Sequence, residues 1–285
     1  MTNISVLRTK YPRITRSLGG PKRFFERLGE QAVFYFRGCR QIGHALHGYR
    51  KETIRLVAEI GMGSGALAVI GGTVVIVAFM TLSAGALLAI QGFASLGDIG
   101  VEALTGFFAA FINVRIVVPV TAGIALAATI GAGATAQLGA MRISEEIDAL
   151  EVMGVQSMSY LVSTRIIGGL IAIVPLYSMA VLMSFLSSQL YTTLIAGQSA
   201  GVYNHYFTTF LRPSDLVWSF LQAIIMATAV MLIHCYYGYN ASGGPAGVGD
   251  AVGRSVRASL VAVVMVTLLI SLAVYGTSGN FNLAG

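Results

Sequence analysis

Five long apolar runs alternate with short polar segments along the chain. They cover approximately residues 63–90, 103–138, 161–190, 215–237 and 256–275. A transmembrane helix needs about 20 consecutive, mostly apolar residues, and each run is long enough to supply one. The second run exceeds one straight crossing, so we expect it to tilt or to lay about ten residues along the outer surface. The pattern predicts an all-α integral membrane protein with about five transmembrane helices.

The composition supports this fold class. Hydrophobic residues make up 55% of the chain and charged residues 11%, whereas an ordinary soluble domain is about 25% charged. A cleavable signal peptide would place its apolar core near residues 10 to 20, but the first apolar run begins only after about 60 residues rich in charge. We therefore expect the mature chain to keep its N-terminus.

The segment before the first apolar run is amphipathic. The stretches PKRFFERLGEQAVFYF and RQIGHALHGYRKETIRLVAEIG mix aromatic or aliphatic residues with basic ones at helical spacing. This is typical of helices that lie in the headgroup layer, although a solvated cytosolic extension would also carry such charges. We divide the chain into an N-terminal cytosolic or interfacial helical segment, 1–60, and a transmembrane domain, 61–285.

The distribution of basic residues predicts the orientation. Twelve of the eighteen Lys and Arg residues lie in residues 1–55, which assigns the N-terminus to the cytosol and, after five crossings, the C-terminus to the outside. The second loop carries Arg142 and Arg165. The fourth carries Arg254 and Arg257, whereas the third has Arg212 alone. Topology and contact with anionic membrane lipids explain the net charge of +6, so we expect no nucleic-acid partner.

Residues that carry chemistry are sparse. Cys39 and Cys235 are both expected at the cytosolic face, where thiols stay reduced, so no disulfide is predicted. Cys39, His44 and His47 match zinc spacings poorly, and surface positions on an amphipathic helix explain them better. The sequence has no GxxxxGK[ST] P-loop and no spacing that calls for nucleophilic catalysis. We therefore expect no metal, no cofactor and no enzymatic activity in this chain.

Glycine serves packing and turns in this sequence. Small residues recur every four positions in the second span and form a smooth stripe that lets a neighbouring backbone approach. They are Gly123, Ala127, Gly131, Thr135 and Gly139. The Gly-rich segment 243–253 lacks the ending of a phosphate-binding loop and predicts a tight cytosolic turn that opens the last helix. Its candidate turn residues are Gly243, Gly244, Gly247 and Gly249.

Arg115, in the stretch FINVRIVVPV, is a basic residue near a span interior. A charge at the centre of a helix costs roughly 2.5 to 3.5 kcal/mol on insertion scales, which makes it a functional suspect. If the crossing starts near residue 115, the side chain can snorkel to the outer headgroups instead. The sequence leaves open snorkelling, structural pairing and a place on a substrate path.

The second cytosolic loop concentrates acidic residues. Glu145, Glu146, Asp148 and Glu151 are four of the twelve carboxylates in the chain. Ser144 before two glutamates predicts a helix start, with a hydroxyl N-cap and carboxylates at the positive end of the helix dipole. The helix is expected to run to about Met153, with Gly154 at its end.

The faces of this short helix differ. Ile143, Ile147 and Leu150 share one face by their i, i+4, i+7 spacing, while the acidic residues spread over the others. Anionic lipid repels such a helix, so it suits a protein partner with basic residues around an apolar groove. Arg142 immediately precedes it and belongs to the same candidate site. A solvated loop is the alternative.

Two motifs carry a resemblance to a known family. The run AQLGAMRISEEIDALEVMGV resembles the signature of the MlaE/YrbE permeases, and GYNASGGPAGVGDAVGRSV resembles their second signature, at the matching place before the last helix. The likeness covers roughly residues 40 to 280 and is strongest to the YrbE subunits encoded with Mce proteins in actinobacteria. It implies the inner-membrane permease subunit of an ABC-type lipid transporter, with ATP hydrolysis in a separate subunit.

The resemblance also implies partners and a coupling site. Such permeases work in pairs with two copies of a cytosolic ABC ATPase and a ring of Mce proteins that crosses the periplasm, and they are associated with lipid uptake. On this chain the likeness makes residues 145–153 the coupling helix, within a segment of about 143–154, that docks in the ATPase. Its carboxylates are expected to meet basic residues while Ile147 and Leu150 fill a groove.

The chain departs from the family pattern in its second span. RIVVP keeps Arg115 and Pro119 of an Arg-Glu-x-Gly-Pro motif but has Ile116 for Glu and Val118 for Gly. AATIGAGATAQLG stands where the family often has AGRxGSAxxAELG, so an Arg is absent and Gln137 replaces Glu. These losses predict pairing with a different, more typical subunit through the Gly-rich spans, and a B-type YrbE subunit fits that role.

A membrane scaffold and an ion-driven carrier are the two alternatives to an ABC-type permease. A membrane scaffold that anchors a periplasmic Mce assembly would have similar spans and no transport. An ion-driven or proton-driven carrier usually has acidic residues inside its spans, and the twelve acidic residues here fall at predicted termini or loops. The lipid itself has little sequence signature, because a wide apolar cavity accepts fatty acids, sterols or longer acyl lipids.

Overall fold

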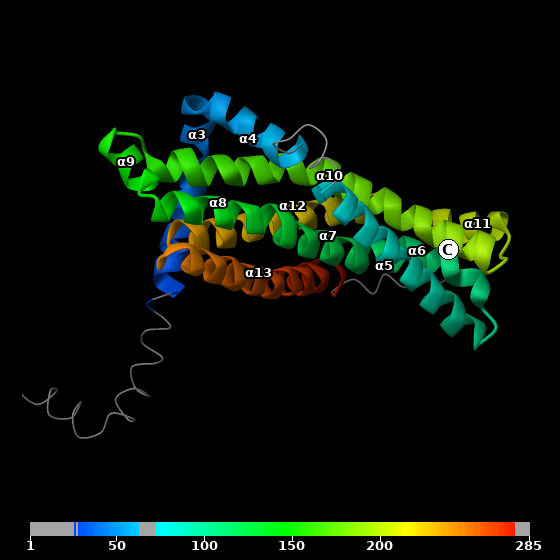
Figure 1. Ribbon diagram of the computed structural model, residues 1–285. Coiled ribbons are helices and arrows are strands. Elements are labelled where there is room, and N and C mark those ends of the chain that lie inside the picture. The colour runs from blue at the N-terminus through cyan, green and yellow to red at the C-terminus, as the bar shows by residue number, and fades with distance from the viewer. Residues whose placement is uncertain (1–25, 27, 63–71, 277–285) are drawn as a thin grey trace, which may run out of the picture.

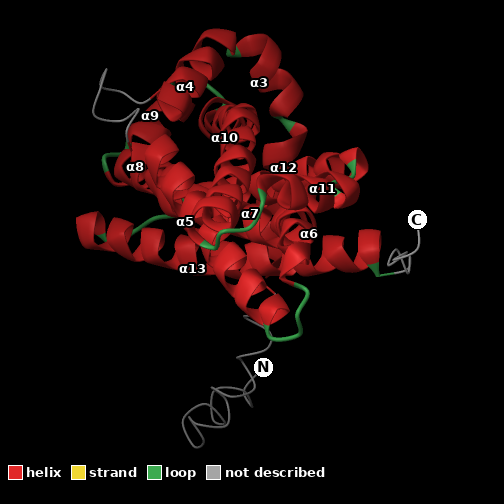
Figure 2. Cartoon of the chain, turned by 90° about the vertical axis from the view of Figure 1, so that its right-hand side faces the viewer, coloured by secondary structure: helices red, strands yellow, loops and turns green. Residues whose placement is uncertain are grey.

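The computed structural model describes residue 26 and residues 28–62 and 72–276, and these residues form helices joined by short loops (Figure 1, Figure 2). Among them, five helical stretches are long and apolar enough to cross a membrane. They are Thr73–Gly97, Glu102–Ile143, Met158–Ile195, Pro213–Tyr239 and Gly244–Val274. The predicted all-α membrane fold with five spans is therefore confirmed.

Two span boundaries differ from the prediction. Helix α5 (Gly72–Gly97) extends past residue 90, and residues 63–71, expected to begin this span, lie outside the described residues. Helix α13 (Gly244–Tyr275) begins at Gly244 instead of near residue 256, because Pro245 fits a first helical turn and the Gly-rich segment continues as helix. Arg254 and Arg257, which the hydropathy pattern assigned to a loop, consequently lie in α13.

The second and third spans are longer than a bilayer is thick. At about 1.5 Å per residue, their 42 and 38 residues reach about 63 and 57 Å, whereas a bilayer with its headgroups measures about 40 to 45 Å. The second comprises η1 (Glu102–Leu104), α6 (Thr105–Ile112), α7 (Val118–Leu126) and α8 (Ala132–Ile143), joined by the π-helical turns η2 (Asn113–Val117) and η3 (Ala127–Gly131). The third comprises the π-helical turn η4 (Met158–Ser163), α10 (Thr164–Leu190) and the π-helical turn η5 (Tyr191–Ile195).

The excess length forms an extension at one end of the molecule. Helix α11 (Ala200–Phe210) packs against α6 there. A Cβ at Gly106 would lie 2.4 Å from the Tyr203 carbonyl oxygen, so this approach requires glycine. The first residues of the second span thus continue as helix into the extension. We name this end the α11 end and the opposite one, where α9 (Glu146–Val152) lies, the α9 end (Figure 1).

The small-residue stripe packs inside the subunit. Helix α12 (Pro213–Tyr239) lies against α8, α10 and α13, and α10 lies along α5. A Cβ at Gly131 would lie 2.5 Å from the His234 ring, and one at Gly139 would lie 2.8 Å from a Val248 methyl group. The stripe therefore lets α12 and α13 of the same chain approach α8. This corrects the expectation that it faces a second subunit.

The N-terminal segment packs on the bundle as amphipathic helices. Residues 28–40 form one helix near the α9 end, followed by α3 (Ile42–Gly48) and by α4 (Arg50–Met62), which lies along α10 (Figure 1). Phe34 is buried, with its ring centroid 5.4 Å from that of Tyr236 and 5.7 Å from that of Tyr239. Phe36, on the other side of the helix, is exposed. The described part of the segment is therefore packed against the bundle and leaves Phe36 on its outer side.

Candidate coupling site and buried polar groups

Helix α9 joins α8 to η4 and is the outermost helix of the α9 end (Figure 1). Ser144 closes α8 instead of capping α9, because its hydroxyl donates to the Ala140 carbonyl at 3.0 Å and to the Glu146 carboxylate at 3.0 Å. Glu145 takes the N-cap position with a left-handed φ of 61°. The N-cap prediction for Ser144 is therefore wrong. Gly154, at φ +78°, ends the helix as expected.

The apolar side chains of α9 point in directions that the sequence did not reveal. Ile147 is fully buried in the core of this chain and Leu150 is partly buried against it. Val152 and Met153 are 88% and 69% exposed. The expectation that Ile147 and Leu150 fill a groove of a partner is corrected, because the bundle of this chain already covers that face. The apolar surface open to a partner is formed by Val152 and Met153, which we call the α9 tip.

Two of the four carboxylates bind other parts of the chain. Arg142 pairs with Asp148 at 2.6 Å. The Ser157 hydroxyl donates to Glu151 at 2.5 Å and lies 2.8 Å from the Tyr239 hydroxyl, which also donates to Glu151 at 3.2 Å. This Glu151–Ser157–Tyr239 triad ties α9 to the end of α12. Sequence reasoning missed Tyr239 because it lies 88 residues from Glu151, and missed Ser157 because it follows the end of α9 and has no helical spacing to it.

Glu145 and Glu146 form the acidic part of the site. Both residues are exposed at the start of α9, and neither forms an ion pair with any other described residue. Together with the α9 tip they present carboxylates and an apolar patch on one short helix. Such a surface suits a protein partner with basic residues around an apolar pocket.

The Gly-rich turn is shorter than predicted. Gly243 and Gly244 have φ of +93° and +70°, which favours glycine at both positions. Gly247 and Gly249 belong to α13. A Cβ at Gly247 would lie 1.8 Å from the Ser242 carbonyl oxygen, so this glycine lets the turn fold back onto the helix. The turn leads from the end of α12 into α13, beside the triad.

Arg115 forms a buried ion pair. Its guanidinium lies 2.8 Å from the Asp215 carboxylate in the first turn of α12, and both side chains are 9% exposed. The guanidinium also lies 3.6 Å from the centre of the Phe111 ring. Of the three alternatives for Arg115, the structure favours structural pairing.

Proline explains the widened helix around this pair. Pro119 has no N–H to bond the Arg115 carbonyl, and its ring crowds that carbonyl, so the preceding residues form the π-helical turn η2. The Ser219 hydroxyl of α12 donates to the Val114 carbonyl at 2.6 Å and contacts the Tyr177 hydroxyl. These bonds give the Val114 carbonyl of the disturbed turn a partner and tie η2, α10 and α12 to one another.

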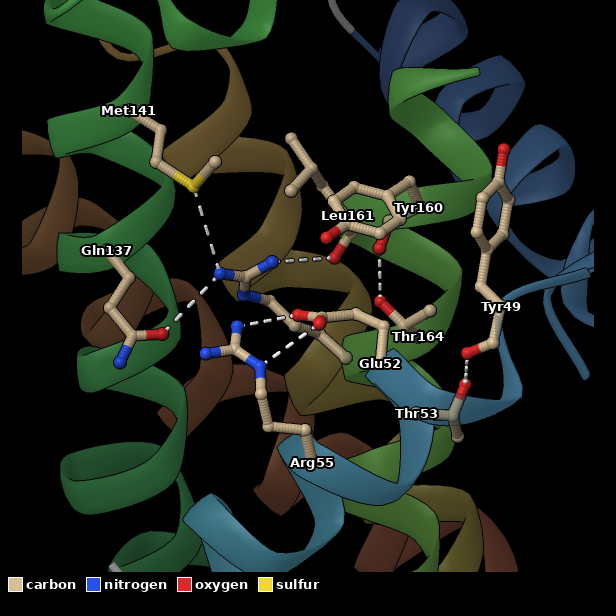
Figure 3. Close-up of polar contacts among 10 residues, drawn as sticks. Tyr49, Glu52, Thr53, Arg55, Gln137, Met141, Tyr160, Leu161 and Thr164 are labelled. Atoms are coloured by element: carbon tan, nitrogen blue, oxygen red, sulfur yellow. Dashed lines mark hydrogen bonds and ion pairs between the residues drawn. The ribbon is translucent and has the colours of Figure 1, made fainter. Parts of the chain in front are cut away.

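Gln137 and Arg165 meet nearer the α9 end. Arg165 is buried in α10 instead of lying in a loop, and its guanidinium donates to the Leu161 carbonyl at 3.0 Å and to the Gln137 side chain at 3.5 Å. Gln137 and Met141 of α8 point toward Glu52 and Arg55 of α4 (Figure 3). The loop assignment of Arg165 is thus corrected. The close-up shows a polar cluster among α4, α8 and α10.

The His and Cys side chains of the described residues serve packing or the surface. It contains no group of three or more His, Cys, Asp and Glu side chains that could hold a metal ion. Cys39 is exposed and Cys235 is buried, and both are free thiols. His234 is buried with one ring nitrogen 2.7 Å from the Thr135 hydroxyl, which places it in the packing between α8 and α12.

Comparison with known proteins agrees with this architecture. A family model described as permease MlaE matches residues 62–273. The intermembrane phospholipid transport system permease protein MlaE of Haemophilus influenzae is 26% identical over 252 residues, which cover 84% of this chain and 92% of that protein. A "Probable ABC transporter permease protein" of Rickettsia bellii is 26% identical over 196 residues, which cover 69% of this chain and 76% of that protein.

A plant relative matches over a shorter stretch. The chloroplastic protein TRIGALACTOSYLDIACYLGLYCEROL 1 of Arabidopsis thaliana is 28% identical over 162 residues, or 57% of this chain, and the match spans 46% of the length of that relative. The family model covers well over half of the chain. This protein is therefore a member of the MlaE family of ABC transporter permeases.

Proposed function

We propose that this chain is the permease subunit of an ABC-type lipid transporter that carries phospholipids or related acyl lipids through the inner membrane. The observation that supports this most strongly is the α9 end, where a short acidic helix with an apolar tip is bonded to two membrane-spanning helices. A relative at 26% identity is named as a phospholipid transport permease. ATP hydrolysis resides in a separate cytosolic ATPase, present in two copies, that docks at α9.

A second permease completes the transport path. The apolar windows of α5 and α13 are only 22% and 17% buried, whereas those of the other three spans are 39% to 56% buried. These two helices therefore have the most surface left for lipid and for a second subunit. We propose a non-identical YrbE-type paralogue as that subunit, since Ile116 and Gln137 replace acidic residues of the typical pattern. In this pairing the chain takes the B-type role.

The α11 end faces the periplasm in this proposal, and the N-terminus is cytosolic. Ile99, Leu194 and Ile195 are 72% to 76% exposed at this end. Such apolar residues at the rim suit contact with periplasmic Mce proteins, which would deliver lipid for import. The division into an N-terminal interfacial segment, 1–60, and a permease domain, 61–285, belongs to the same proposal.

Transport by the reconstituted complex tests the function. The chain is co-expressed with its ATPase, paralogue and Mce proteins, placed in proteoliposomes, and assayed for transfer of a fluorescent phospholipid. We expect transfer that requires ATP and stops when the ATPase is inactivated. Assembly without ATP-dependent transfer would indicate a scaffold, and transfer driven by an ion gradient alone would indicate a carrier. The latter is disfavoured because the acidic residues of the described spans, Glu102, Asp215 and Asp250, lie near helix starts.

A further inference from the structure

A cavity of about 400 Å³ lies between the helix of residues 28–40 and the ends of the third and fourth spans at the α9 end. Pockets that bind small molecules have volumes of about 300 to 1,000 Å³. The helix of residues 28–40 forms one wall, and η4 and the end of α12 form the other. We call this cavity the N-terminal pocket. Its lining includes Glu30, Val33, Phe34, Arg37, Met158 and Asn240.

The wall formed by residues 28–40 is fixed to the bundle. Phe34 is buried, and its ring packs against those of Tyr236 and Tyr239. One turn later, the Gly38 carbonyl accepts a hydrogen bond from the Ser163 hydroxyl at 2.9 Å. A ligand binds more tightly when the walls of its site need no ordering as it enters. The N-terminal pocket is therefore already formed in this chain.

Two opposite charges lie at the two ends of this wall. Glu30 and Arg37 are two helical turns apart on one face of the helix, which separates them by about 10 Å along its axis. Both residues are exposed, and neither forms an ion pair with another described residue. Val33 and Phe34 lie between them and are apolar. Because the two charges balance, the pocket suits a ligand that carries both a cation and an anion.

The polar groups of the pocket differ in what they can bind. Asn240 donates through its amide nitrogen to the Tyr236 carbonyl at 2.8 Å, which orients the side chain and leaves its amide oxygen as an acceptor. This oxygen and the Glu30 carboxylate suit the N–H donors of an ammonium group. Arg37 presents the planar set of N–H donors that matches the oxygens of a phosphate.

The pocket lies at headgroup depth. Helix α12 has 27 residues and is therefore about 40 Å long. A bilayer with its headgroups measures about 40 to 45 Å, so the last turn of α12 lies in a headgroup layer. Tyr236, Tyr237 and Tyr239 gather in this turn, as aromatic side chains do at membrane interfaces. Lipid headgroups are therefore the ligands most abundant around the pocket.

We propose that the N-terminal pocket binds a phospholipid whose headgroup carries both a phosphate and an ammonium group, from the membrane leaflet at the α9 end. Arg37 donates to the phosphate oxygens, and Glu30 and Asn240 accept from the ammonium group. Val33 and Met158 contact the apolar part of the lipid next to the headgroup. The bound lipid joins the helix of residues 28–40 to the third and fourth spans. It is a component of the subunit, so the inference does not depend on the proposed transport.

Calorimetric titration of the full-length chain in detergent tests the pocket. The probes are dihexanoyl phosphatidylethanolamine, dihexanoyl phosphatidylglycerol, which has no cation, and phosphoethanolamine, which has the headgroup without acyl chains. We expect the first to bind at least about tenfold more tightly than the other two, because a hydrogen bond between charged groups and the burial of apolar carbons each contribute enough for such a factor. Equal affinity for phosphatidylglycerol would show that the ammonium group is not recognised. Equal affinity for phosphoethanolamine would show a site for a soluble ligand, and either result overturns the proposal.

Variants assign the binding to this pocket. Glu30→Gln should lower the affinity for phosphatidylethanolamine to about that for phosphatidylglycerol, because it removes the charge that attracts the ammonium group. Arg37→Gln should weaken the binding of both lipids by about tenfold, and Arg37→Lys, which keeps the charge, should recover part of the loss.

Arg40→Gln is the matched control. Arg40 is exposed on the same helix outside the pocket, so its replacement should leave the affinity for both lipids unchanged. Glu30 and Arg37 are exposed too, so their variants should fold, and thermal unfolding checks this. A wild-type preference for phosphatidylethanolamine in Glu30→Gln, or wild-type affinity in Arg37→Gln, would overturn the proposal.

Discussion

The α9 end and the Arg115–Asp215 pair use charge in opposite ways. At the α9 end, Arg142 and Asp148 are 37% and 58% exposed, and Glu145 and Glu146 are open to solvent. Arg115 in η2 and Asp215 in α12 are each 9% exposed. Exposed ion pairs contribute about 0 to 1 kcal/mol to stability and are screened by salt. Removing one partner of a buried pair is strongly destabilising, because it leaves the other charge buried without a partner. The first region is therefore open to contact with a partner, whereas the second fixes η2 to α12.

The largest effect should come from removing one partner of the buried pair. Asp215→Ala leaves the Arg115 charge buried and should destabilise the protein by about 3 to 5 kcal/mol. Thermal unfolding in detergent, followed by circular dichroism, measures the change. The double variant Arg115→Met with Asp215→Leu is the control, because it removes both charges and should regain most of the lost stability. A single variant as stable as the double one would show that the pair is unimportant.

The α9 tip should matter for partner binding and Ile147 for folding. Val152→Asp places a charge where an apolar contact with the ATPase is expected and should cost several kcal/mol of binding if that contact is dry. Ile147→Ala opens a cavity in the core of this chain and should cost about 2 to 5 kcal/mol of stability, with binding retained by the folded fraction. Copurification of the ATPase and thermal unfolding separate the two effects. The reverse pattern would restore Ile147 as the docking residue.

The sequence predicted those features of the fold and the site that depend on residues close together in the chain. The hydropathy of the five spans, the acidic helix after α8 and the turn at Gly154 all follow from neighbouring residues. The shared face of Ile147 and Leu150 was also predicted, but whether it meets the bundle or a partner depends on packing between distant segments. Asp215 lies 100 residues from Arg115, so no periodicity links them.

Removing the Tyr239 hydroxyl should loosen α9 without detaching the ATPase. Tyr239→Phe keeps the ring that packs on Phe34 but removes the bonds to Ser157 and Glu151, which contribute about 1 kcal/mol. We expect faster hydrogen exchange in residues 146–152 and less lipid moved per ATP hydrolysed. Tyr237→Phe is the control, since the Tyr237 ring, which the change keeps, makes its contacts with the Tyr236 ring at 5.4 Å and the Arg254 guanidinium at 6.0 Å. If hydrogen exchange in residues 146–152 and the amount of lipid moved per ATP both stay unchanged, the Glu151–Ser157–Tyr239 triad does not hold α9 in place during transport.

The smallest effect on partner binding should come from reversing the solvent-exposed charges of Glu145 and Glu146. Replacing Glu145 and Glu146 by Lys leaves the fold intact, because both residues are exposed and lie outside the core. If they meet basic residues on the ATPase, reversal should slow association more than it speeds dissociation, since charges at the rim of an interface mainly steer encounter. The difference from the wild type should shrink as salt rises, because exposed charges are screened within about 8 Å at physiological ionic strength. Association rates measured by surface plasmon resonance at low and high salt decide the matter. A salt-independent loss of binding would mean that these carboxylates are buried at the interface, and the contrast between an adaptable α9 end and a fixed Arg115–Asp215 pair would then fail.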